Sequence, residues 1–79
     1  MSNTFLRNFT RAAAVTPSDA TVINAAALYI GGAGNVAVIM EGDTAAVTFT
    51  APPVGTVLNI SVSKVMATNT TATLILALN

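Results

Sequence analysis

The stretch "ALYIGGAGNVAVIMEGDTAAVTFT" (residues 27–50) decides the fold class, because short apolar runs alternate in it with turn residues. The runs are rich in the β-branched and aromatic residues that strands favour, and the glycine-rich "GGAGN" between the first two is expected to form a hairpin turn. Both faces are apolar in residues 36–40, whereas Val47 and Phe49 share one face of the next run and threonines occupy the other. The pattern predicts β-strands rather than helical packing.

A second strand pattern follows in "TVLNISVSKV" (residues 56–65). Apolar and polar residues alternate from Leu58 to Val62, and the alternation then breaks because Lys64 falls in the apolar phase. One inserted residue would restore the pleat, so we expect a β-bulge near Ser63.

The C-terminal run "TLILALN" (residues 73–79) places three leucines on one face of a strand. An uncovered strand of this kind would be a hazardous open edge, so we expect it to be paired, with a neighbouring subunit as one candidate partner. The face expected to form a subunit interface comprises Leu74, Leu76 and Leu78. Residues 20–79 are thus predicted to be an all-β domain, a small antiparallel β-barrel or sandwich of about five to six strands.

The N-terminal segment, residues 1–19, differs from this pattern and is predicted to be an arm that ends in a turn at Pro17. Residues 4–14 could form a short helix or remain extended, because about ten residues make only a marginal helix in water. Our hypothesis is that the arm binds an apolar groove on a partner; in the alternative, its aromatic side chains fold back onto this domain's own core. The expected partner-binding residues lie at i, i+4 spacing: Phe5, Arg7, Phe9 and Arg11.

The composition explains why a partner is expected. Of the 79 residues, 53% are hydrophobic and only 8% are charged, whereas ordinary domains have about a quarter of their residues charged. A lone domain of this composition would expose large apolar or neutral patches, which usually mark interaction sites or lead to aggregation. We therefore expect a chain that packs against other chains.

Several classes of function are disfavoured by the residues that are missing. With a formal net charge of zero, no basic surface is available to attract nucleic acid. The chain has no His and no Cys, so the usual general base and thiol nucleophile are absent, and neither an enzyme nor a cofactor is expected. The uncharged residues 20–40 contain several glycines and asparagines and are too weakly apolar for a membrane span.

Two weak motifs have ordinary explanations. The "GAGNVA" at residues 32–37 fits the spacing of a dinucleotide-binding loop, but it leads into a β-branched run instead of the helix that such a loop requires. Glu41, Asp43 and Asp19 could supply oxygen ligands to calcium, but acidic residues beside glycine or serine are common in turns. No metal site is expected.

Five segments, in their order and spacing, resemble the small spike-base (head spike) family of tailed bacteriophages and gene transfer agents: "AVTPSDATVI", "AALYIGGAGNVAV", "AVTFT", "PVGTVL" and "VMATNTTATLILAL". The resemblance covers roughly residues 15–77. Its most specific parts are residues 16–19, 28–31 and 70–73. Glycine is common in the family at the position of Asn69, which implies a positive φ there.

The resemblance implies a virion structural protein on the phage head surface. Its expected partner is the major capsid protein, which it would bind as a capsid decoration (cement) subunit or as a head-spike base. The resemblance also implies a homo-oligomer. We expect a trimer, which suits local three-fold positions of a shell, with a spike or fibre protein as a further candidate partner. The alternative is a host-adsorption module that binds cell-surface carbohydrate, for which Tyr29 is the candidate aromatic, although we expect Tyr29 to lie in the core.

Overall fold

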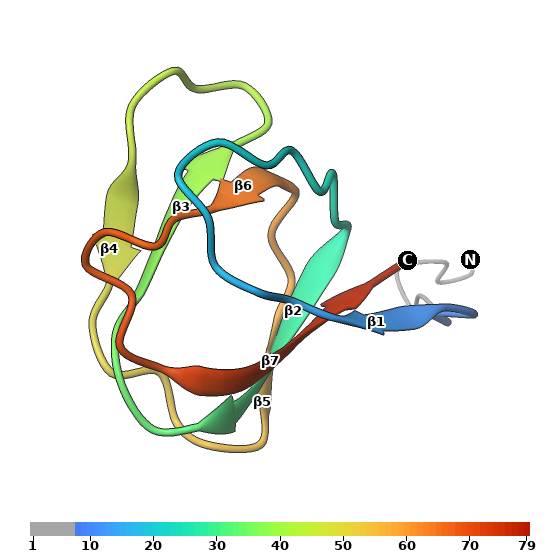
Figure 1. Ribbon diagram of the computed structural model, residues 1–79. Coiled ribbons are helices and arrows are strands. Elements are labelled where there is room, and N and C mark those ends of the chain that lie inside the picture. Colours follow the sequence, from blue (N-terminus) through green and yellow to red (C-terminus); the bar gives the residue numbers. More distant parts are fainter. Residues whose placement is uncertain (1–7) are drawn as a thin grey trace, which may run out of the picture.

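The computed structural model describes residues 8–79, which fold as seven β-strands in two antiparallel sheets (Figure 1). The four-stranded sheet has the order β1-β7-β2-β5, and the three-stranded sheet has the order β4-β3-β6. No helix occurs among these residues, so none is long and apolar enough to cross a membrane. The strand bounds are β1 Ala12–Ala14, β2 Ala27–Gly32, β3 Val36–Met40, β4 Val47–Phe49, β5 Thr56–Leu58, β6 Val62–Val65 and β7 Thr73–Leu78.

The hydrophobic core lies between the two sheets. Every second side chain of a strand points inward, so β2 contributes Leu28 and Ile30, and β3 contributes Val36 and Val38. The core is completed from β6, β7 and the flanking loops by Ala25, Val62, Val65, Ala72, Ile75 and Ala77. The all-β prediction is confirmed, and the arrangement is that of a small sandwich.

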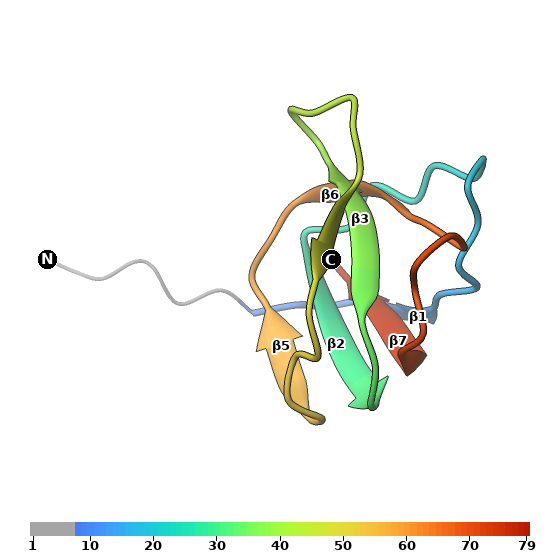
Figure 2. The same ribbon diagram turned by 90° about the vertical axis from the view of Figure 1, so that its left-hand side faces the viewer.

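The structure has more strands than expected partly because residues 56–65 form two strands in different sheets. β5 pairs with β2, and β6 pairs with β3. Between them the chain turns sharply, with the Ile60 amide donating to the Leu58 carbonyl at 2.9 Å, and it arches from one sheet to the other (Figure 2). In β6 the predicted bulge is confirmed: Lys64 pairs with Ile39 and Val62 with Met40, which leaves Ser63 as the extra residue.

The additional strand β1 lies within the segment that was predicted to be an arm. Ala12 pairs with Leu78 and Ala14 with Leu76, so residues 12–14 are extended and the helical alternative is wrong for them. β7 is therefore not an edge strand, because β1 and β2 of the same chain bond to its two sides. The main-chain groups of β7, rather than any helical propensity of three alanines, determine the conformation of β1.

The glycine-rich segment after β2 does not form the expected hairpin, because β2 and β3 belong to different sheets. The segment carries the chain from one sheet to the other and passes close to the loop before β7. A Cβ atom on Gly34, whose φ is 143°, would lie 2.4 Å from the Ala72 nitrogen, so only glycine fits there.

The loop between β6 and β7 completes the hydrogen bonding of β3. The Ala37 amide donates to the Thr70 hydroxyl and the Asn35 amide to the Thr71 hydroxyl, each at 2.9 Å. Asn69 has a φ of 69°, as the family resemblance implied. The Thr70 hydroxyl thus takes the place of a neighbouring strand at Ala37, and the Thr71 hydroxyl does so just before β3 begins.

Candidate interaction surface

The outer face of the four-stranded sheet is apolar on all four strands. On β7, Ile75 and Ala77 point into the core, so the three leucines point outward. The strand register extends this layer in both directions, with Leu76 opposite Ala14 of β1 and opposite Tyr29 of β2. We call this surface the apolar face; its residues are Ala12, Ala14, the buried Ala27, Tyr29, Gly31, Val57, Leu74, Leu76 and Leu78.

Much of the apolar face is open to solvent. Leu74 is 75% exposed and Val57 is 39% exposed, while Tyr29, Leu76 and Leu78 are half-buried. No residue of the face is charged. Contiguous apolar surface of this kind on a small domain usually marks a contact with another molecule.

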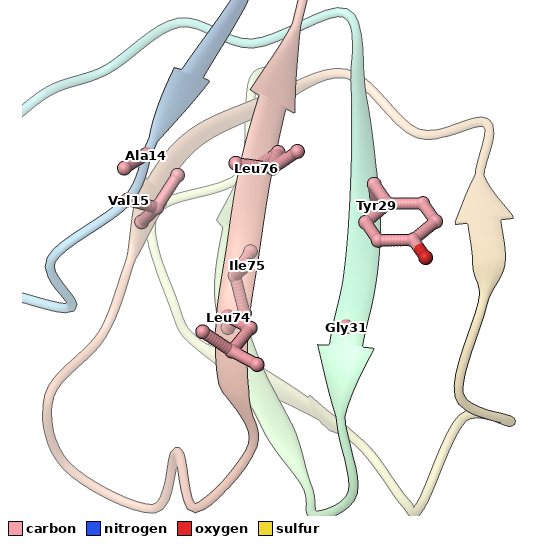
Figure 3. A pocket seen from close by; sticks show the side chains of 7 residues that line it. All are labelled: Ala14, Val15, Tyr29, Gly31, Leu74, Ile75 and Leu76. Carbon is pink, nitrogen blue, oxygen red and sulfur yellow. The ribbon is translucent and has the colours of Figure 1, made fainter.

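An open groove of about 510 Å³ runs along this face between β1, β7 and β2 (Figure 3). Leu76 of β7 and Tyr29 of the neighbouring β2 both line the groove, with the Tyr29 ring directed toward β5, and Leu74 stands at one end. The lining residues are Ala14, Val15, Tyr29, Gly31, Leu74, Ile75 and Leu76. The tyrosine hydroxyl is the single polar side-chain group among them.

Gly31 allows β7 to approach β2 closely at the end of the groove. A Cβ atom on Gly31 would lie 2.6 Å from the carbonyl oxygen of Leu74 and 2.9 Å from its Cβ. Any larger residue would therefore push Leu74 away from β2. The missing side chain also leaves the groove open beside Tyr29.

Leu74 has an unusual backbone conformation for a leucine within a strand. Its φ is 54°, in the left-handed region that costs a non-glycine residue about 1–2 kcal/mol. The same residue exposes three quarters of its apolar side chain. Strained residues of this kind persist where surrounding structure holds them, and they are frequent at functional sites.

The structure describes some of the interaction residues proposed from the sequence and leaves out others. Leu74, Leu76 and Leu78 do share one outward face; their role as a subunit interface stays a prediction. Phe5 and Arg7 lie outside the described residues. Phe9 is half-buried, and Arg11 is exposed at the end of the four-stranded sheet, where its amide donates to the Asn79 carbonyl at 2.9 Å.

Tyr29 does not lie in the core as expected. It is half-buried on the outer face and lines the groove. Sequence reasoning also missed Gly31 and Ala14. For Gly31 a signal existed, because strand alternation puts it in the same phase as Tyr29; for Ala14 there was none, since its place depends on pairing with the far end of the chain.

Of the three acidic residues considered as calcium ligands, Asp19 accepts hydrogen bonds from Thr68, and Glu41 and Asp43 are exposed in a turn. The Thr68 hydroxyl and amide donate to the Asp19 carboxylate at 2.6 Å and 2.9 Å, and these hydrogen bonds, the hydroxyl first, hold the pKa of Asp19 below its ordinary value. Glu41 and Asp43 are exposed beyond the end of β3. Residues 8–79 contain no group of three His, Cys, Asp or Glu residues that could hold a metal ion.

Comparison with known proteins yields one informative similarity. No protein-family model matches the chain, and no curated protein matches it. Among solved structures, the chain is similar to a protein in the capsid of a native gene transfer agent particle, determined with C5 symmetry. The two share 30% sequence identity and superpose with a TM-score of 0.80, over 91% of this chain and 84% of the other.

Proposed function

Because this chain belongs to the same family as that gene transfer agent capsid protein, we propose that it is a structural protein of a virion, located on the capsid surface. The match to the capsid chain is the observation that carries this proposal, since it extends over most of both chains. The low content of charged residues agrees with it, because a capsid subunit covers its neutral surface with other subunits.

Within this role, the protein attaches to the major capsid protein as a cement subunit or as the base of a head spike, where it could also carry a spike or fibre protein. It forms a homo-oligomer, for which we expect a trimer. The leucines of the apolar face, Leu74, Leu76 and Leu78, supply the contact between its subunits. The support for this is their shared outward orientation on a face without charge.

The N-terminal segment is the proposed contact with the major capsid protein, through Phe5, Arg7, Phe9 and Arg11. Its support is the exposure of Arg11 at the outer end of β1. Because residues 12–14 form a strand of the four-stranded sheet, a truncation that tests the segment should stop before β1.

The test is co-sedimentation of the purified protein with capsids that lack it. We expect the full chain to bind, and a variant without residues 1–7 to remain folded and oligomeric but to lose most of its binding. Failure of the full chain to bind would refute the capsid role, and normal binding of the truncated chain would refute the role of the segment. The copy number distinguishes positions: roughly sixty or more copies indicate a lattice role, and about a dozen indicate a vertex.

A further inference from the structure

We propose that the groove on the apolar face receives the Leu74 side chain of a second copy of this chain. The inference rests on the homo-oligomer of the proposed function and specifies its contact. Each copy donates its own Leu74 and accepts that of the next copy, a contact that forms a closed ring when the rotation between copies closes.

The chemistry of the surface favours a second copy as the occupant. No residue of the apolar face is charged, so two identical faces meet without like-charge repulsion. A strongly charged partner would have to bury charged side chains against Leu74, Leu76 and Tyr29 without a counter-charge, and the desolvation of those charges would oppose binding.

The geometry supplies both a protruding residue and a recess. Leu74 is the most exposed of the large hydrophobic residues in the described chain, at 75%, and it stands at the end of the groove that it helps to line. The recess beside it is apolar and is kept open by Gly31. A leucine side chain entering this recess exchanges water for contacts with Tyr29 and Leu76.

The described part of the N-terminal segment approaches the groove along β1. β1 starts at the end of the sheet where the Thr10 amide bonds to Asn79, and it runs toward the groove, which it reaches at Ala14 and Val15. The described chain therefore enters the sheet at the end away from the groove. Occupation of the groove by the residues before Asn8 is the outcome that the truncation below tests.

The strain at Leu74 makes the inference testable with one substitution. Asn adopts positive φ values far more readily than Leu, so Leu74→Asn relieves the backbone while it removes the apolar side chain. If Leu74 served only the fold of its own chain, this variant would be neutral or stabilised and would assemble normally. If Leu74 fills a neighbour's groove, the variant is stable but does not assemble.

The experiment measures the mass of the full-length protein by analytical ultracentrifugation over a range of concentrations, together with thermal unfolding. We expect Leu74→Asn to raise the dissociation constant of the oligomer at least tenfold, while its unfolding temperature, measured at a concentration where both proteins are dissociated, is not lowered. The matched control is Val22→Asn, which removes a valine that is 56% exposed, next to Ile23, whose amide bonds to β6 of the other sheet. This control should assemble like the wild type.

Three results would overturn the inference: a wild-type protein that is monomeric at millimolar concentration, a Leu74→Asn variant with the wild-type dissociation constant, or an oligomer that is lost on removal of residues 1–7. The outcomes also separate this inference from the capsid role. If the wild type binds capsids and Leu74→Asn assembles as the wild type does, only the groove contact is refuted. Loss of assembly in Leu74→Asn without capsid binding by the wild type would refute only the capsid role.

Discussion

The two sheets of the sandwich have similar inner faces and different outer faces. Inward, both present aliphatic side chains to one core. Outward, the three-stranded sheet carries Thr48, Lys64 and a half-buried Ile39, with Ser63 in the bulge, and the amide of its buried Ala37 bonds to the Thr70 hydroxyl of a loop of the same chain. The four-stranded sheet carries leucine, tyrosine, valine, alanine and glycine on its outer face, and Leu74 there is largely exposed.

The difference between the two outer faces shows that the sequence contains more apolar residues than the core uses. The additional ones lie largely on the outer face of the four-stranded sheet. A sandwich of this size can fill its core from strands whose outward residues are polar, as β4 and β6 show with Thr48 and Lys64. Strands that are apolar on both faces are typical of sheets covered on both sides. The four-stranded sheet therefore has the composition of an internal sheet, which is the basis for proposing a contact on its outer face.

The largest effect is expected from a charge placed on the outer face of the four-stranded sheet. The same charge on the outer face of the three-stranded sheet is the control. Leu76→Asp puts a carboxylate in the groove, and we expect it to raise the dissociation constant of the oligomer by about 100-fold, roughly 3 kcal/mol, because the charge would be buried without a partner. Thr48→Asp, on the exposed outer face of β4, should leave it unchanged. Sedimentation equilibrium measures both. Equal effects of the two substitutions would mean that the faces do not differ in function.

A smaller effect is expected when a crowded glycine of the apolar face and an unhindered glycine elsewhere are replaced. Gly31→Ala forces a Cβ against the carbonyl of Leu74 and should lower the free energy of unfolding by about 1–3 kcal/mol. Gly42→Ala meets nothing within 4 Å and should be neutral or stabilising by up to about 1 kcal/mol. Denaturant unfolding gives both values. A neutral Gly31→Ala would show that β7 can move away from β2, and that the strain at Leu74 is not enforced.

The smallest effect concerns pH and lies outside the apolar face. Hydrogen bonds from Thr68 lower the pKa of Asp19 below 3.8 in the folded state, so the ionised carboxylate stabilises the fold above that pH, and this stabilisation is lost as the pH falls through the lowered pKa. Asp19→Asn should therefore reduce stability at neutral pH and flatten its decline below about pH 4. Thermal unfolding between pH 2 and 7 provides the test. An unchanged decline in Asp19→Asn would assign the acid sensitivity to other carboxylates.

Part of this structure follows from local sequence patterns. The alternation in residues 56–65 and its break at Lys64 predicted the bulge at Ser63, because the two-residue period of a strand leaves no other simple way to keep Val62 and Val65 both buried. The outward face of β7 followed in the same way from the spacing of its leucines. Both inferences use a period that a single strand imposes on its own residues.

The rest depends on contacts between distant parts of the chain. The same ten residues contribute to both sheets, and alternation alone does not reveal the crossing at Ile60. β1 is three alanines with no periodicity, and it is a strand because β7 offers it hydrogen bonds. The groove was missed for this reason, since Ala14 meets Leu76 only through that pairing. The positive φ of Leu74 has no sequence signature at all.

The pairing of β1 with β7 has a consequence for how the protein is made. The groove needs Ala14 from one end of the described chain and Leu76 from the other, so it does not exist while the ribosome is still synthesising β7. The proposed association of copies through this face therefore cannot begin before β7 has been translated.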